Sequence, residues 1–256
     1  TYDFFKPTFN VKLAESRGEI KLAQKLRYKV FFSERIKNPI LNIGNFRRDS
    51  DKFDNYADHI IVTHRKSKFS KTKVIGTYRL LKQSVAEKKS GFYSCDEFNL
   101  ENLLNSRIYN NMLELSRSCI SQKFRNKNVL QLMWKEIHHY INKNNIDALF
   151  GTASFLSTNV SKIEDQLIYL NHHHKMPDNI TVSALPKYRV NIDYQKKINL
   201  NIRLFAKLPT LIKAYLKFNA SIGTGAVIDN KFKTTDVFIF LPIEKINKEY
   251  VNKILD

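Results

Sequence analysis

The stretch Met112–Ile120, with the sequence MLELSRSCI, places a charged pair inside an otherwise apolar strand pattern. The pair is Glu114 and Arg117. Burial of such charges costs free energy unless they are paired or used in chemistry. A carboxylate here could act as a general base, and a guanidinium could pair with it or hold an anionic group. The pattern therefore predicts a functional site on this strand.

A second chemical signal is a run of acidic residues in a basic chain. Between Arg48 and His59 the sequence contains Asp49, Asp51, Asp54 and Asp58. A calcium loop that begins at Asp49 requires glycine at its sixth position and glutamate at its twelfth, but the chain has Asp54 and Ile60 there. Composition alone favours a solvated acidic loop.

Two further groups suggest chemistry that the sequence does not support. His172, His173 and His174 are adjacent on a predicted helix and point in different directions, so a polar helix end is favoured over a metal site, and we expect no metal. Cys119 lies in the apolar strand pattern, where a buried thiol is ordinary. With Cys95 it makes only two cysteines, which is too few for a disulfide framework and indicates a reducing compartment.

The charge balance points to an anionic partner. The 256 residues contain 43 Lys and Arg against 24 Asp and Glu, a net charge of +19. Nucleic acid, an anionic membrane and an acidic protein all fit this charge. The sequence has no zinc-ligand spacing, basic zipper or aromatic RNA-binding signature, so nucleic acid is not expected. No apolar run has transmembrane length, and we expect a cytoplasmic protein with peripheral contact at the inner face of the membrane.

The elements that must position these residues follow from hydrophobic periodicity. The capping-box spacing of Ser16–Glu19 predicts a helix. Arg27 lies among its apolar residues and could reach inward as a cation, although a solvated arginine is the commoner case. The remaining periodic segments predict strands at His59–Thr63, Val74–Leu81, Ala148–Phe155 and Thr235–Leu241, and helices at Val129–Lys143 and Ile163–His174.

One segment has two readings. Ile198–Phe218 mixes basic and apolar residues and contains Pro209. Such a stretch suits a membrane surface or a substrate tunnel, whereas the simpler reading is a core-covering helix interrupted at the proline. We predict peripheral membrane contact through this segment.

Several segments, in order along nearly the whole chain, resemble the bacterial ornithine-acyl carrier protein N-acyltransferases. They are LRYKVFF (26–32), DSDKFDNYADHIIV (49–62), VIGTYRLL (74–81), GFYSCDEFNL (91–100), LELSRSCI (113–120), LFGTASF (149–155) and the closing segment 211–242. The first half is also similar to acyl-homoserine-lactone synthases and N-acyl amino acid synthases.

The resemblance implies a GNAT-like α/β (α+β) fold. It implies a central mixed, mostly antiparallel sheet, helices on both faces, and a splayed strand pair around the acyl-pantetheine site. We expect a single domain over residues 1–256, with a C-terminal extension from about residue 175 that packs on or completes the core.

The resemblance also implies a linked charge cluster beside the acyl site. Its positions here are Arg27, Asp51, Asp54, Arg79, Glu114 and Arg117. Glu114 and Asp54 take catalytic positions. We expect Arg27 and Arg117 to pair with carboxylates, while Arg79 could do so or hold the substrate carboxylate.

The predicted donor site departs from ordinary GNAT enzymes, which bind coenzyme A through a glycine-containing loop. The matching segment Gln122–Asn128 (QKFRNKN) has no glycine. A helix start can still hold a single phosphate, here with Lys123, Arg125 and Lys127. The departure favours an acidic acyl carrier protein, whose phosphopantetheine arrives as part of the substrate, so that no separate cofactor is expected.

The implied reaction is N-acyl transfer by direct aminolysis of the thioester. A (3-hydroxy)acyl group moves to the α-amine of ornithine and gives lyso-ornithine lipid, with Glu114 as the proton acceptor. Another acceptor, such as glutamine, glycine or a homoserine-type amine, stays open. So does a non-enzymatic reading as a basic nucleic-acid-binding or membrane-binding module.

Overall fold

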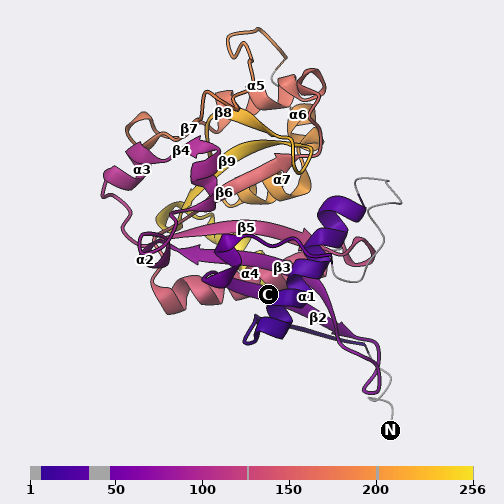
Figure 1. Cartoon of the computed structure of the whole chain (residues 1–256). Coiled ribbons are helices and arrows are strands. Elements are labelled where there is room, and N and C mark those ends of the chain that lie inside the picture. The colour runs from indigo at the N-terminus through magenta and orange to yellow at the C-terminus, as the bar shows by residue number, and fades with distance from the viewer. Residues whose placement is uncertain (1–6, 35–46, 126, 200–201, 256) are drawn as a thin grey trace. The chain divides into compact units, whose positions relative to one another are not determined.

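The computed structural model of the chain describes residues 7–34, 47–125, 127–199 and 202–255. The chain forms two compact units (Figure 1). The first comprises residues 1–85, 115–145 and 255, and the second comprises residues 86–114, 146–254 and 256. The boundary passes through strand β5 (Met112–Ile120), between Glu114 and Leu115. The expectation of one domain with an extension from about residue 175 stays a prediction.

The first unit is a small antiparallel sheet with a helix on each face. Its elements are β1 (Thr8–Leu13), α1 (Arg17–Tyr28), η2 (Lys29–Ser33), η4 (Lys52–Asn55), β2 (Asp58–Arg65), β3 (Lys73–Lys82), the second part of β5, η6 (Gln122–Phe124) and α4 (Lys127–Asn144). Strand β2 pairs antiparallel with both β1 and β3. The short helix α2 (Gln83–Ala86) lies at the unit boundary.

The alternation of side chains along β3 separates the two helices. Tyr78 contacts Trp134 of α4, and an added Cβ at Gly76 would meet Met133 of the same helix at 3.3 Å. Arg79, one residue on from Tyr78, points to the other face and reaches the same carboxylate as Arg27 of α1. Since successive side chains of a strand point to opposite faces, α1 and α4 cover opposite faces of this sheet. This confirms the predicted helices on both faces.

Helix α1 begins after Ser16, as predicted, although Glu19 caps the N–H of Glu15 and not that of Ser16. The Ser16 hydroxyl accepts from the Glu19 backbone N–H at 3.2 Å, and the Glu19 carboxylate accepts from the Glu15 N–H at 2.8 Å. The helix buries Arg27 completely, so the inward-reaching cation is the correct reading and the commoner solvated arginine is wrong. The chain then widens into one π-helical turn at Lys29–Ser33, a feature often found near functional sites.

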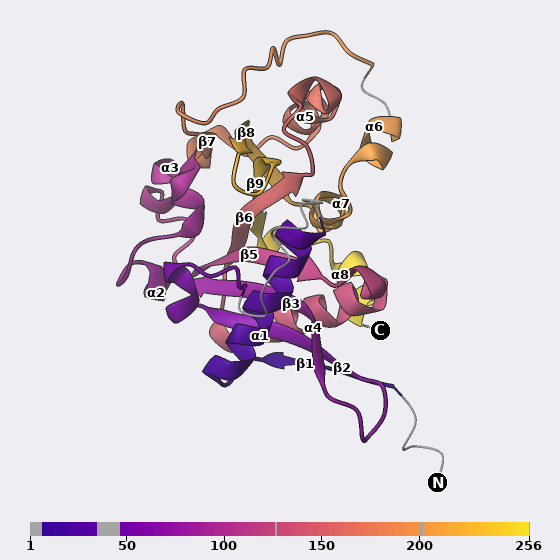
Figure 2. The same ribbon diagram turned by 45° about the vertical axis from the view of Figure 1, so that its right-hand side comes forward.

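The second unit contains the first part of β5 and the remaining strands. Its elements are η5 (Tyr93–Asp96), β4 (Phe98–Asn99), α3 (Glu101–Asn105), β6 (Ala148–Phe155), η7 (Val160–Lys162), α5 (Glu164–His173), η8 (Asp178–Ile180), β7 (Ser183–Ala184), α6 (Ile202–Lys207), α7 (Thr210–Lys217), β8 (Ser221–Asp229), β9 (Thr234–Pro242), η9 (Ile243–Lys245) and α8 (Lys248–Leu255). Figure 2 shows β6, β8 and β9 side by side.

The strand pairing is mixed and mostly antiparallel, as predicted. Pairs β6–β9, β8–β9 and β4–β7 are antiparallel, whereas β5–β6 and β7–β8 are parallel. The β5–β6 ladder joins Met112–Glu114 to Ala148–Phe150, and β5 continues for six more residues to Ile120. The ladder therefore covers only the start of β5, and the splayed strand pair around an acyl-pantetheine site stays a prediction.

The segment Ile198–Phe218 folds as two short helices separated at Pro209, which caps α7. Residues 200–201 lie outside the described residues. Leu204, Leu208 and Ile212 are buried, so much of the apolar face faces the protein interior. None of the helices in the described ranges combines the length and apolar character needed to cross a bilayer.

Candidate active site

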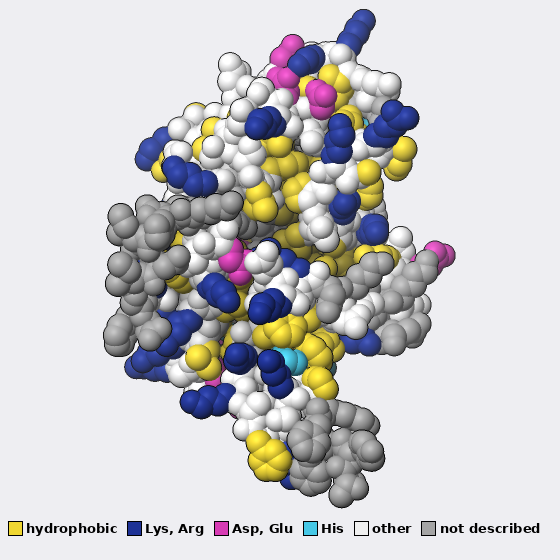
Figure 3. All heavy atoms as spheres, turned by 90° about the vertical axis from the view of Figure 1, so that its right-hand side faces the viewer, with side chains coloured by type: hydrophobic (Ala, Val, Ile, Leu, Met, Phe, Trp, Pro, Cys, Tyr) yellow, Lys and Arg dark blue, Asp and Glu magenta, His cyan; other side chains and the backbone are white. Residues whose placement is uncertain are grey.

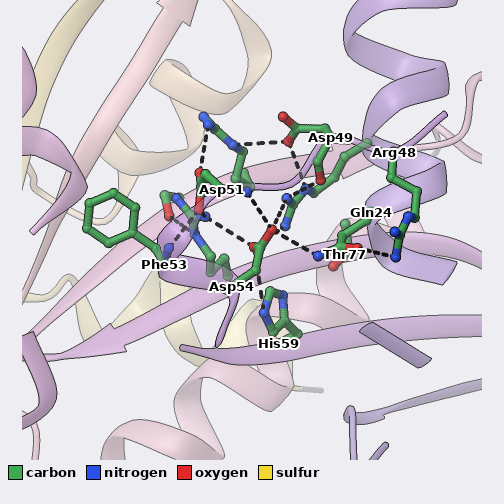
Figure 4. Close-up of polar contacts among 12 residues, drawn as sticks. Gln24, Arg48, Asp49, Asp51, Phe53, Asp54, His59 and Thr77 are labelled. Atoms are coloured by element: carbon green, nitrogen blue, oxygen red, sulfur yellow. Dashed lines mark hydrogen bonds and ion pairs between the residues drawn. The ribbon is translucent and has the colours of Figure 1, made fainter. Parts of the chain in front are cut away.

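Six ionised side chains of the first unit form one buried network, the charge cluster (Figure 4). Three are guanidinium groups and three are carboxylates, so their formal charges balance: Arg27, Arg79, Arg117, Asp49, Asp51 and Asp54. Paired charges avoid most of the penalty that an isolated buried ion would suffer. The sequence resemblance placed five of these in a cluster, and the structure brings all five together.

Arg27 is the innermost member of the cluster. Its Nη1 and Nη2 donate to the two oxygens of Asp54, both at 2.8 Å, and its Nε donates to Asp49 Oδ2 at 2.9 Å. Gln24, one turn earlier on α1, adds an amide hydrogen bond to Asp54 Oδ2 at 3.1 Å. This fork geometry fixes α1 against the Asp49–Asp54 segment.

The other two arginines reach the cluster from strands. Arg79 of β3 donates through Nη1 to Asp51 at 2.6 Å and to Asp54 at 3.2 Å, and through Nε to Ser116 Oγ at 3.0 Å. Arg117 of β5 bonds Asp51 Oδ2 at 3.0 Å and forms an ion pair with Asp49 at 3.1 Å. All three arginines therefore pair with aspartates, which is the role expected for Arg27 and Arg117 and now found for Arg79.

The local structure of η4 explains why the carboxylates of Asp51 and Asp54 point toward the arginines of the cluster. Asp51 caps the 3-10 turn η4 by accepting from the Phe53 N–H at 3.0 Å, while Asp54 accepts from the Asp51 N–H at 3.2 Å. This reciprocal capping box turns both carboxylates inward. Three of the four aspartates in the acidic run, Asp49, Asp51 and Asp54, thus belong to the buried cluster, whereas Asp58 is exposed. The solvated loop favoured by composition is wrong for these three.

The guanidinium groups of the cluster lower the pKa values of the Asp51 and Asp54 carboxyls. Burial alone raises the pKa of Asp54, but the hydrogen bonds and charge of Arg27 and the charge of Arg79 outweigh it and lower the pKa. The pKa of Asp51 is lowered in the same way, by Arg79 and Arg117 against burial. Both groups are anionic at neutral pH, so Asp54 is a weak proton acceptor and its catalytic assignment stays a prediction.

His59 is a cluster neighbour that sequence reasoning did not single out. It lies opposite Arg79 in the β2–β3 register, and its side chain is 1% exposed with Nε2 3.8 Å from Asp54 Oδ1. Burial and the charges of Arg27 and Arg79 lower its pKa, although Asp54 opposes them. The ring is therefore neutral at physiological pH.

Strand β5 is distorted where it meets the cluster. Arg117 has a φ of 54°, in the left-handed region that non-glycine residues rarely adopt. Ser116, directly before it, is buried and accepts the Arg79 hydrogen bond. Residues held in this way often mark functional sites.

Glu114 belongs to the second unit and is completely buried. Its Oε1 accepts from the Ser94 N–H and hydroxyl, both at 2.7 Å, and its Oε2 accepts from the Tyr93 N–H at 2.9 Å. The carboxylate thus holds the start of η5, within the GFYSCDEFNL segment. This contact gives Glu114 a positioning role beside the predicted role as base, which stays a prediction.

The predicted donor-binding segment lies between β5 and α4. Lys123 and Arg125 are exposed, and Arg125 donates to the Ile120 carbonyl at 3.0 Å and pairs with Glu34. Lys127 begins α4, whereas Asn126 lies outside the described residues. The structure places the first two cations at one turn, and their role in phosphate binding stays a prediction.

Comparison with known proteins gives matches to the charge-cluster region and to nearly the whole chain. Residues 26–135 match the Acetyltransferase (GNAT) domain family. The L-ornithine N(alpha)-acyltransferase of Brucella abortus (strain 2308) is 39% identical over 248 residues, which cover 96% of this chain and 88% of the relative. That of Rhizobium meliloti (strain 1021) is 38% identical over 243 residues, covering 94% and 82%. The chain belongs to the L-ornithine N(alpha)-acyltransferase family.

Membership of this family makes the chain an acyltransferase and confirms the family resemblance read from the sequence. Among solved structures, the chain is similar to the CoA-dependent acyl-homoserine lactone synthase BjaI. The identity is 11% and the TM-score 0.48, over 96% of this chain and 88% of that chain.

Asp49 was noted in the acidic run but not predicted in the cluster, and three further members of the site escaped sequence reasoning for a physical reason. Gln24, His59 and Ser116 are common polar residues, and no spacing rule distinguishes a buried one from a solvated one. Their proximity depends on the packing of α1, β2 and β5 around the aspartates. The only available signal was that His59 ends the acidic run at the start of a strand.

A separate acidic group lies in the second unit. Ligand oxygens of Glu97, Asp229 and Asp236 lie within 4.8 Å of one another. Hard cations such as calcium take six to eight oxygen ligands, so three nearby carboxylates do not by themselves define a metal site. The expectation that the protein needs no metal stays a prediction.

Proposed function

We propose that the protein transfers a (3-hydroxy)acyl group from acyl carrier protein to the α-amine of L-ornithine, forming lyso-ornithine lipid. The observation that carries this proposal is the 39% identity to a named L-ornithine N(alpha)-acyltransferase over 96% of the chain. The buried charge cluster and the distorted β5 strand support it, because they lie within the segments that carry the family resemblance.

The proposed chemistry is aminolysis of a thioester. The neutral α-amine attacks the acyl carbonyl, the C–S bond breaks as the amide C–N bond forms, and the amine proton leaves while the pantetheine thiolate takes up a proton. An α-amine is largely protonated at neutral pH, so a proton acceptor is needed. We assign this role to Glu114, directly or through water, because the lowered pKa of Asp54 makes that carboxylate a poorer acceptor.

The charge cluster would then act by positioning. Its three arginines pair with aspartates, and Asp51 is its most exposed carboxylate, with 18% of its side chain accessible. A rigid, ion-paired wall can orient a substrate without itself changing protonation. The cluster therefore supports binding and orientation, with proton transfer assigned elsewhere.

The donor is proposed to be an acyl carrier protein. The glycine-free segment Gln122–Asn128, the exposed Lys123 and Arg125, and the net charge of +19 support an acidic partner. On the face drawn in Figure 3, Lys and Arg side chains are widespread and Asp and Glu side chains are few. The proposed reaction uses no separate cofactor, since the phosphopantetheine belongs to the donor. We also propose that the protein is cytoplasmic and contacts the anionic membrane that receives its product.

The test is an acylation assay with purified protein and a 3-hydroxyacyl carrier protein. Ornithine should be acylated at its α-amine, and glutamine, glycine and homoserine serve as competing acceptors. Mass spectrometry of lipids from cells that express the chain should show a new lyso-ornithine lipid. Preferred acylation of another amino acid would overturn the proposed acceptor but leave N-acyl transfer in place.

A further inference from the structure

The connection between β2 and β3 is unusually basic. Over residues 65–73 (RKSKFSKTK) five of nine side chains are cationic, and the chain contains no acidic residue between Asp58 and Glu87. All five cations are exposed: Arg65, Lys66, Lys68, Lys71 and Lys73. We call residues 65–73 the basic hairpin tip.

The basic hairpin tip is an ordered turn. The β2–β3 ladder ends at the pair His64 and Lys73. Beyond it, Ser70 N–H donates to the Ser67 carbonyl at 3.0 Å, and the Ser70 hydroxyl accepts from the Ser67 N–H at 2.9 Å. The Arg65 guanidinium also bonds Thr72 Oγ1 across the turn, at 3.0 and 3.2 Å. These bonds fix which side chains the turn presents.

The turn presents an aromatic side chain to solvent. Phe69 is 81% exposed, more than any other large hydrophobic residue in the described part of the chain. Figures 1 and 2 both show the connection extending beyond the ends of β2 and β3. Most of this apolar ring is therefore accessible to water, and transfer of that surface into an apolar environment would be favourable.

We propose that the basic hairpin tip docks the protein on an anionic membrane surface, with its cations at lipid phosphates and Phe69 among the headgroups and upper acyl chains. Basic residues beside an apolar side chain are the usual means of reversible interfacial binding. A stable interface between proteins needs about 20–30 residues on each side, which a nine-residue projection does not supply by itself. This inference rests on the turn itself and does not depend on the identity of the acylated amine.

The inference also relocates the expected membrane contact. The segment 198–218 buries Leu204, Leu208 and Ile212, so its apolar residues are largely used inside the protein. The basic hairpin tip instead keeps both its charges and its aromatic side chain accessible. The hairpin is therefore the better candidate for membrane binding.

The experiment uses the full chain and sedimentation with two kinds of vesicle, phosphatidylcholine alone and phosphatidylcholine with phosphatidylglycerol. Each cation contributes roughly 1 kcal/mol near an anionic surface, which is about fivefold in partitioning. The triple variant Lys66→Gln, Lys68→Gln, Lys71→Gln should bind anionic vesicles about a hundredfold less. Phe69→Ser should weaken binding about tenfold or more.

The matched control removes the same charge from another exposed surface of the first unit. Lys21, Lys25 and Lys29 are exposed on α1 and the following turn, and their triple Gln variant should retain at least a third of the wild-type partitioning. Equal loss in both triple variants, or wild-type binding by the hairpin variants, would overturn the proposal. Acylation with soluble substrates should be unchanged in all variants. Unchanged vesicle binding with impaired use of the carrier protein would assign the hairpin to an acidic protein instead.

Discussion

At Glu114, the hydrogen bonds that fix the carboxylate also compete with its use as a base. Its three donors come from Tyr93 and Ser94. Glu114→Gln keeps the shape but cannot accept the amine proton, so we expect the acylation rate to fall by roughly 10²- to 10⁴-fold. A modest drop in melting temperature should accompany it, because an amide nitrogen now faces one of the backbone donors.

Ser94→Ala provides the matched comparison for Glu114→Gln. It removes one hydrogen bond to the same carboxylate and leaves the base intact, so it should lower the melting temperature similarly while retaining most of the rate. Measuring melting and acylation for both variants separates the two roles. If both lose rate in proportion to stability, Glu114 positions η5 and the base lies elsewhere.

Asp54 accepts hydrogen bonds from Arg27, Arg79 and Gln24 in the interior of the cluster. Asp54→Asn leaves three buried guanidinium groups facing two carboxylates, and breaking a buried pair typically costs about 3–5 kcal/mol. In a protein of this size, that corresponds to a fall in melting temperature of roughly 6–20 °C. Asp178, whose side chain is 84% exposed in its pair with Lys175, is the control: Asp178→Asn should melt like the wild type. A wild-type melt for Asp54→Asn would contradict the structural role of the cluster.

His59 should give the protein a measurable dependence on pH. Its pKa in the folded state is below the ordinary value near 6.5, so the unfolded chain binds the proton more readily. The stability from this group is complete above about pH 6.5 and is lost as the pH falls toward the folded-state pKa. We expect the wild-type melting temperature to fall between pH 7.5 and 5.5, and to fall less in His59→Gln. The exposed His172→Gln should keep the full wild-type dependence.

At the scale of elements, the sequence predicted the parts with strong periodicity and missed those without it. The predicted strand Ala148–Phe155 is β6 residue for residue, and the helix from Val129 lies within α4. Strand β8 was missed because Gly223 and Gly225 interrupt its apolar pattern, and β1 because it is a short, exposed edge strand. The aspartate run needed the family resemblance, since only tertiary packing shows that these carboxylates meet arginines.

Gly223, one of the two glycines that interrupt the apolar pattern of β8, is required by the packing around it. An added Cβ at Gly223 would lie 2.8 Å from the Val182 carbonyl oxygen and 3.0 Å from Phe238 Cβ. We therefore expect Gly223→Ala to destabilise the protein by about 1–3 kcal/mol. Gly18, in the first turn of α1, has only Ser16 Oγ near the corresponding position, at 3.6 Å, and Gly18→Ala should raise stability by up to about 1 kcal/mol. Chemical denaturation of the two variants should therefore give changes of opposite sign.

At the scale of the whole molecule, the excess of cations makes a prediction about the donor. A net charge of +19 attracts an acidic carrier over distances comparable with the Debye length, about 10 Å at 0.1 M salt and 3 Å at 1 M. Steered association weakens as ionic strength rises, so the KM for acyl carrier protein should increase from 0.05 to 0.5 M salt. The kcat should change much less, because the buried charge cluster is shielded from solvent ions.

The control for the donor prediction is an acyl-coenzyme A with the same acyl chain. Its phosphates are also anionic, so salt alone does not distinguish the donors, but the carrier presents an extended acidic surface and coenzyme A does not. We expect kcat/KM to be higher with the carrier at low salt and to fall more steeply with salt than with coenzyme A. Lys123→Gln should reduce the carrier's advantage, whereas Lys25→Gln on α1 should not, because Lys123 lies at the predicted phosphate-binding turn and Lys25 on the exposed face of α1. Equal use of both donors with the same salt dependence would show that the basic surface serves another partner.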